Sequence, residues 1–87
     1  MTLNFPNASR SYDPEKHCVS FWGYDATFEI AFDLHEDALR RLNPQGRRDE
    51  ASLLTVFDGN RGQIERVAGV AYNRQRKRYL RLSAADF

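Results

Sequence analysis

The chain has 87 residues, of which 41% are hydrophobic and 29% charged, which is typical of a folded protein rather than a disordered tail. This length provides one domain, residues 1–87, with a modest core and too little surface for a deep active-site cavity, which disfavours a standalone enzyme. The formal net charge of +1 hides a split that indicates a contact surface: residues 1–39 hold seven acidic and two basic side chains, whereas residues 40–87 hold eleven basic and five acidic ones.

The first third of the chain reads as two strands separated by a turn. A short strand around residues 9–12 precedes residues 13–16, where proline follows aspartate as in a tight turn. From Val19 the residues alternate, which predicts a strand with Val19 and Phe21 on one face and Trp22 on the other. Residues 23–26 are then expected to turn the chain.

The next strand has the clearest pattern in the sequence. Its apolar face carries Phe28, Ile30, Phe32 and Leu34, and its other face carries Thr27, Glu29, Ala31 and Asp33. A register shift of one residue would expose four large apolar groups, so one face is strongly specified as the inner one. Val19 and Phe21 of the hairpin partner are expected to join the same layer.

Helical spacing replaces the alternation after this strand. Ala38, Leu39 and Leu42 share one side of a predicted short helix whose first turn contains Glu36 and Asp37, and the Asn-Pro-Gln-Gly segment at residues 43–46 ends it. Asp49 can cap a second helix whose apolar positions continue to Ala71. Residues 58–60 resemble a turn, but the apolar phase continues across them, so the pattern favours one long helix over residues 49–74, with a kink left open, rather than two helices.

Alternation returns at residues 79–83 and predicts a last strand with Leu80 and Leu82 facing inward. The expected fold is α+β, with the element order β-β-β-α-α-β. It has two layers, an antiparallel sheet of three to four strands and helices packed on one face. The other face, which includes Trp22, is then left open.

Five blocks of the sequence carry a family resemblance. They read FPNASRSYD at residues 5–13, FWGYD at 21–25, EDAL at 36–39, FDGNR at 57–61 and AADF at 84–87. In this order they resemble a family of small bacterial proteins, the domain-of-unknown-function family 1488, over nearly the whole chain. The resemblance implies a bacterial cytoplasmic protein of mixed α and β content, and it implies no activity, substrate or catalytic residue. Family members often have alanine at the position of Gly59, which fits a continuous helix there.

Nothing in the sequence indicates export or membrane insertion. No apolar run approaches the roughly 20 residues that span a bilayer, and the polar start lacks the basic and apolar regions of a signal peptide. The single cysteine, Cys18, allows no intramolecular disulfide and no cysteine-based metal cluster. We therefore expect a cytoplasmic protein that does not bind a membrane.

The basic C-terminal region is a candidate nucleic-acid-binding site. It comprises Arg74, Arg76, Lys77, Arg78 and Arg81. Arginine predominates in it, its planar guanidinium suits phosphate, and tyrosines lie beside and within the run. The alternative is that these cations complement the dipole at the end of the long helix and are otherwise solvated. The isoelectric point of about 7.9 favours this alternative, because nucleic-acid-binding domains usually exceed about 9.

Trp22, Glu29 and Asp33 on the open face are candidate partner-binding residues. A large aromatic side chain on a polar face suits an anchor for a protein partner or a second copy of the chain. The alternative is a tryptophan folded under the N-terminal segment, against Phe5 or Tyr12. Glu29 and Asp33 share a face, but paired carboxylates indicate acid–base catalysis only in a cleft that shifts their pKa values. An ordinary ion pair with Arg81 across the sheet is the simpler expectation.

The remaining polar residues predict no metal site, no cofactor and no catalytic residue. His17 and Cys18 are neighbours on a strand and point to opposite faces, and nothing positions a base for the thiol. The leading hypothesis is a non-enzymatic cytoplasmic protein-interaction or regulatory module that associates with itself or another protein through the open sheet face. The alternative is a nucleic-acid-binding accessory protein that uses the basic region at residues 74–81.

Overall fold

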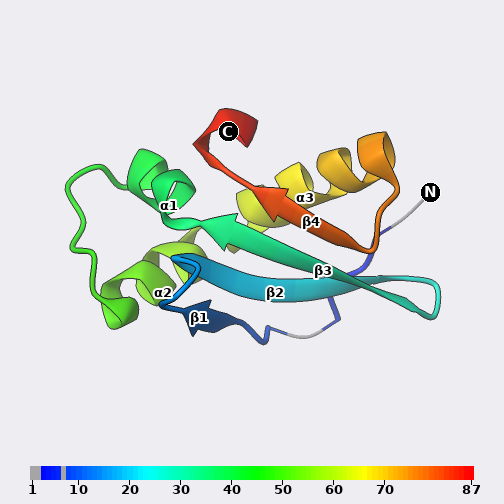
Figure 1. Cartoon of the computed structure of the whole chain (residues 1–87), viewed down its shortest axis with the longest axis horizontal. Coiled ribbons are helices and arrows are strands. Elements are labelled where there is room, and N and C mark those ends of the chain that lie inside the picture. Colours follow the sequence, from blue (N-terminus) through cyan, green and yellow to red (C-terminus); the bar gives the residue numbers. More distant parts are fainter. Residues whose placement is uncertain (1–2, 7) are drawn as a thin grey trace.

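The computed structural model describes residues 3–6 and 8–87 and consists of a four-stranded sheet with helices against one face (Figure 1). The elements in chain order are β1 (Ser11–Asp13), β2 (Cys18–Asp25), β3 (Phe28–His35), α1 (Glu36–Leu42), α2 (Glu50–Gly59), α3 (Arg61–Gln75), β4 (Tyr79–Leu82) and the short 3-10 helix η1 (Ala84–Asp86). The strands lie side by side in the order β1-β2-β3-β4. The predicted α+β fold, with helices between the third and fourth strands, is confirmed.

The direction of β4 differs from the prediction. β1, β2 and β3 are antiparallel neighbours, but β4 pairs in parallel with β3, so the sheet is mixed rather than antiparallel. The helices α1, α2 and α3 form the crossover that a parallel connection needs. Alternation shows which residues of a strand share a face, and it is the same for either strand direction, so it could not reveal this pairing.

The single long helix predicted over residues 49–74 is wrong, because the chain breaks at Asn60 into α2 and α3. The Asn60 backbone N–H donates to the carbonyl oxygens of Val56 and Phe57 at 3.1 Å each, and its side-chain amide donates to Val56 at 2.9 Å. Such side-chain bonds to the backbone compete with helix continuation. The predicted apolar phase is nevertheless correct, because Phe57 and Ile64 are both fully buried.

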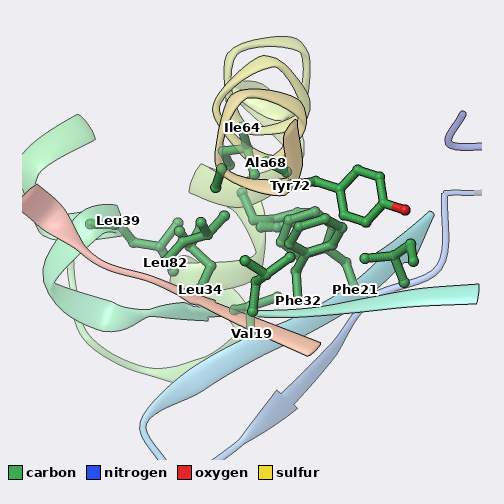
Figure 2. Close-up of a cluster of buried hydrophobic side chains, with 14 of the residues drawn as sticks. Val19, Phe21, Phe32, Leu34, Leu39, Ile64, Ala68, Tyr72 and Leu82 are labelled. Carbon is green, nitrogen blue, oxygen red and sulfur yellow. The ribbon is translucent and has the colours of Figure 1, made fainter. Parts of the chain in front are cut away.

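The core fills the space between the sheet and the helices (Figure 2). Phe21 and Phe32 stack at 5.2 Å between ring centroids, and Phe57 of α2 meets Phe21 edge-on at 5.2 Å. The predicted inward face of β3 is confirmed for Ile30, Phe32 and Leu34, and that of β4 for Leu80 and Leu82. Phe28 is the exception. It is 52% exposed at the hairpin tip, where the Arg78 guanidinium lies 4.6 Å from its ring centroid.

The hairpin between β2 and β3 turns later than residues 23–26, at Ala26 and Thr27. β2 continues through Gly23 because the N-terminal segment packs directly against it there. A Cβ atom at Gly23 would lie 2.8 Å from the Asn4 carbonyl oxygen, and Asn4 forms two backbone hydrogen bonds with Tyr24, at 2.7 and 2.8 Å. The earlier turn at residues 13–16 is confirmed, since the Asp13 carboxylate accepts from the Glu15 N–H at 3.0 Å.

Candidate functional site

The sheet face opposite the helices is the candidate site, and we call it the open face. Its side chains come from alternate positions of the strands. They are Ser11 and Asp13 of β1, Cys18, Ser20, Trp22 and Tyr24 of β2, Glu29, Ala31, Asp33 and His35 of β3, and Tyr79 and Arg81 of β4. The register sets them in rows across the strands. One row is Trp22, Ala31 and Tyr79, in which the small Ala31 lies between two aromatic residues.

A buried carboxylate lies at the centre of the open face. Asp33 is only 4% exposed, and it accepts from the Ser20 hydroxyl at 2.6 Å and from the Tyr79 hydroxyl at 2.5 Å. The Lys16 ammonium lies 3.7 Å from the same carboxylate and 5.9 Å from the centroid of the Tyr79 ring. Four separate segments of the chain therefore meet at this network, which ties β2, β3, β4 and the turn before β2 together.

The network keeps Asp33 ionised although it is buried. Desolvation alone would raise the pKa of this carboxyl, but hydrogen bonds from Ser20 and Tyr79 and the charge of Lys16 outweigh it and hold the pKa below its usual value. The same bond raises the pKa of Tyr79 to about 12, so its hydroxyl remains a donor. A carboxylate with a lowered pKa is a weak base, so the arrangement holds charge in place rather than moving a proton.

Trp22 points to the open face and is half-buried there. The two aromatic residues that could have covered Trp22 lie on the other side of the sheet. The Phe5 ring packs against Phe21 and Phe32 at 6.0 Å between centroids, and Tyr12 packs against the core opposite Val19. Trp22 therefore lies on a different layer from both aromatic residues that could have covered it.

The structure separates the three predicted partner-binding residues by exposure. Trp22 is half-buried, Glu29 is exposed and contacts the Tyr24 hydroxyl at 3.4 Å, and Asp33 is covered by its own hydrogen-bond donors. Arg81 lies beside Asp33 in the register, but the cation that pairs with Asp33 is Lys16. Sequence reasoning missed the role of Lys16. The sequence does offer one signal for this role, because Lys16 is one of only two cations in the acidic residues 1–39, the other being Arg10.

The predicted basic region begins at the end of α3 and continues into β4. All five of its cations, Arg74, Arg76, Lys77, Arg78 and Arg81, are exposed. The Arg76 backbone adopts a left-handed conformation with φ 56°, and its guanidinium lies 5.7 Å from the Tyr72 ring centroid. In the described part of the chain, no carboxylate forms an ion pair with Arg74, Lys77, Arg78 or Arg81. Arg81 gives the β4 edge of the open face a positive charge, whereas Arg78 lies over Phe28 toward the other face of the sheet.

The two histidines and the cysteine, which are the side chains that most often bind transition metals, lie apart from one another. His17 contacts Glu36 at 3.2 Å, and His35 accepts from the backbone N–H of Asp37 at the start of α1. Cys18 is 1% exposed, its thiol donates to the Lys16 carbonyl at 3.1 Å, and desolvation raises its pKa, which disfavours a nucleophilic thiolate. Over residues 3–6 and 8–87, no group of three His, Cys, Asp or Glu side chains could hold a metal ion.

Comparison with known proteins identifies the family. The family model described as "Protein of unknown function (DUF1488)" matches residues 3–82. The chain belongs to the DUF1488 family. No curated protein and no solved structure shows a significant match to it. Among the described residues of this DUF1488 protein, no helix is both long enough and apolar enough to cross a bilayer.

Proposed function

We propose that this DUF1488 protein is a non-catalytic interaction module that forms a homodimer through its open face. The row of Trp22, Ala31 and Tyr79 carries the proposal. A half-buried tryptophan beside an alanine offers a projection and a recess on one surface, as a self-complementary interface requires. Tryptophan and tyrosine are also the residue types that most often dominate interface energetics.

A two-fold axis parallel to the strands, between β2 and β3, gives the best match of the open face with itself. It places β2 of one copy over β3 of its partner, so Trp22 lies over the alanine of its own row. It also places β1 over β4. The turn after β1, with Asp13 half-buried and Glu15 exposed, then faces the β4 edge that contains Arg81.

The size of the open face determines how tight such a dimer would be. The strands β1 to β4 have three, eight, eight and four residues, so with about 3.3 Å per residue and about 4.8 Å between strands the sheet spans roughly 360 Å² in projection. Stable interfaces bury about 800 Å² on each partner. We therefore expect a reversible, concentration-dependent dimer rather than an obligate one.

Replacing Trp22 with alanine should abolish the dimer and leave the fold intact. The side chain is only half-buried and lies outside the core, so the cost to folding is small compared with the loss of the interface anchor. Sedimentation velocity from micromolar to millimolar concentration should show a monomer–dimer equilibrium for the wild type and monomer alone for Trp22→Ala. Trp22 is the only tryptophan, so its emission should shift to the red as the wild type is diluted.

Val70→Ser is the matched control, because Val70 is 58% exposed on the opposite layer of the molecule and should leave the dimer unchanged. The charge pairing has its own check: Asp13→Arg and Arg81→Asp should each weaken the dimer, and the double variant should restore it. A wild type that remains monomeric at every concentration, or a Trp22→Ala variant that dimerises normally, would refute the proposal.

Nucleic-acid binding is the second candidate function, and it is supported by the absence of an ion pair at Arg74, Lys77, Arg78 and Arg81 among the described residues. If Arg74, Lys77, Arg78 and Arg81 bind phosphates, each phosphate contact releases counterions, so affinity for single-stranded oligonucleotides should fall steeply between 50 and 200 mM salt. Arg76→Glu with Arg78→Glu should weaken binding at least tenfold in a fluorescence anisotropy titration. Arg47→Glu with Arg48→Glu, at exposed positions between α1 and α2, is the charge-matched control. Equal binding by the two double variants would rule this candidate out.

A further inference from the structure

Two hollows flank Val70 on the outer face of α3, away from the sheet. One lies between α3 and η1, has a volume of about 330 Å³ and is lined by Val67, Val70 and Ala71 among others. The other lies between α3 and the N-terminal segment, has a volume of about 480 Å³, and includes Phe5 and Val70. Both hollows are open to solvent, so they suit side chains of a partner rather than an enclosed ligand. Val70, 58% exposed, is the apolar ridge that the two hollows share.

Unneutralised positive charge surrounds this ridge. Arg66 lines both hollows and Arg74 lines the first, and neither forms an ion pair with any residue in the described ranges. Of the carboxylates that line the hollows, Glu65 is paired with Arg61 at 2.8 Å, whereas Asp86 accepts the neutral Ser83 N–H at 2.8 Å and keeps its negative charge in the first hollow. An occupant of this face therefore meets apolar surface bordered by two guanidinium groups and one carboxylate, with a net positive charge.

We infer that the outer face of α3 is a docking surface for an acidic amphipathic helix of a partner protein. Apolar side chains spaced three, four and seven residues apart would enter the two hollows on either side of Val70, and carboxylates beside them would meet Arg66 and Arg74. This inference does not depend on the homodimer, because the open face lies on the other layer of the molecule.

A second copy of the chain does not fit this surface. Arg66 and Arg74 lie four residues before and after Val70, so two antiparallel α3 helices crossing at Val70 would bring Arg66 of each against Arg74 of the other. A parallel pairing would set each arginine against itself. Like charges opposed across an interface cost several kcal/mol, which disfavours pairing of two α3 helices here and favours an acidic partner.

Glycines on the same side of α3 allow the partner backbone to approach closely. Gly62 and Gly69 both line the second hollow. Among the described atoms, a Cβ at Gly69 would meet nothing within 4 Å, and one at Gly62 would meet only the Arg66 side chain at 4.0 Å. Glycine inside a helix is less stable than alanine, so the isolated fold would be more stable with alanine at both positions. A partner backbone that approaches this side of α3 would account for both glycines.

The test uses a designed 18-residue helical peptide with leucines on one stripe and glutamates beside it, and a twin with lysines in place of the glutamates. Titration into the ¹⁵N-labelled full chain should give amide shifts along α3 around Val70 for the glutamate peptide, with at least tenfold weaker binding of the lysine peptide. Arg66→Glu with Arg74→Glu should reverse this preference. Trp22→Ala should change neither result.

The glycine variants separate docking from folding. Gly69→Ala should raise the melting temperature by roughly 4–8 °C, and Gly62→Ala, at the second position of α3, should raise it by less. Each should weaken binding of the glutamate peptide at least threefold. Gly59→Ala, at a position equally open but at the end of α2, should raise the melting temperature without weakening binding. Amide shifts confined to the basic region at residues 74–81, equal binding of both peptides, or no effect of the α3 glycine variants would each overturn the inference.

Discussion

Phe21→Ala is expected to lower the free energy of unfolding by about 3–5 kcal/mol, the range observed for phenylalanine deleted from a packed core. Phe21 is fully buried and lies where three parts of the chain meet. Its ring stacks on Phe32 of the neighbouring strand, meets Phe57 of α2 edge-on, and packs against Phe5 of the N-terminal segment at 6.0 Å between centroids. The deletion therefore leaves a cavity and also removes three ring contacts, each worth about 0.5–1.5 kcal/mol beyond the area buried.

A domain of this length has a total stability of roughly 4–13 kcal/mol, so the Phe21→Ala variant should be marginally folded at 25 °C. Urea denaturation followed by circular dichroism measures the change directly. Phe28→Ala is the matched control: it is the same substitution in the same sheet at a ring that is 52% exposed, and it should cost about 1 kcal/mol or less. Similar losses in the two variants would mean that the aromatic cluster is not the centre of the core.

The layers of the fold could be predicted because the alternation within each strand shows which of its side chains face the core. Alternation along β3 separates Ile30 and Phe32 from Ala31 and Asp33, and one face must then meet the helices. The direction of β4 had no such local signal. The connection from β3 contains three helices and is long enough for a parallel crossover, and a connection of this length also permits antiparallel pairing.

The break between α2 and α3 shows a different limit of sequence patterns. The apolar stripe continues through the break, since Phe57 and Ile64 both face the core, so periodicity alone predicts one helix. The side chain of Asn60 decides otherwise by bonding to the backbone carbonyl of Val56. A pattern of burial reports which face a residue occupies, whereas helix termination depends on a local bond that periodicity does not detect.

The open face was predictable as a surface but not as a network. Alternation placed Trp22 and Asp33 on it, and the simplest expectation was an exposed carboxylate paired with Arg81 across the sheet. The structure instead buries Asp33 beneath Tyr79 and Lys16, which come from the last strand and from the turn before β2. Tyr79 lies 46 positions after Asp33 in the sequence and Lys16 lies 17 positions before it, so no local sequence pattern connects these groups.

Asp33→Asn is expected to lower the free energy of unfolding by about 1–3 kcal/mol at pH 7. Asparagine preserves the shape, but it loses the ion pair with Lys16, and its NH₂ group must point toward a donor, the hydroxyl of Ser20 or of Tyr79. The loss should depend on pH in a direction set by the lowered pKa of Asp33 in the folded protein. Its ionised form stabilises the fold above the pKa of the unfolded carboxyl, about 3.9, and this contribution is lost as the pH falls through the lower folded pKa.

The difference in stability between the wild type and Asp33→Asn should therefore be constant from pH 5 to 8 and shrink as the pH falls from about 4 to 2. Urea denaturation at each pH gives both curves. Other carboxyls with lowered pKa values, such as Glu36 and Asp58, titrate in both proteins and cancel in the difference. Curves that stay parallel down to pH 2 would show that Asp33 is not held ionised by the fold.

Tyr79→Phe identifies what keeps Asp33 charged. It removes one of the two hydroxyl donors but leaves the desolvation in place, and desolvation acts to raise the pKa of Asp33. Titration followed by the ¹³C shift of the Asp33 carboxyl should therefore give a higher pKa in Tyr79→Phe than in the wild type. Tyr24→Phe, on the same face but bonded to Glu29, should leave it unchanged. Because the pKa of Tyr79 is about 12, its bond to Asp33 should persist through neutral pH and weaken only in strong alkali, so the network loses stability at both extremes of pH.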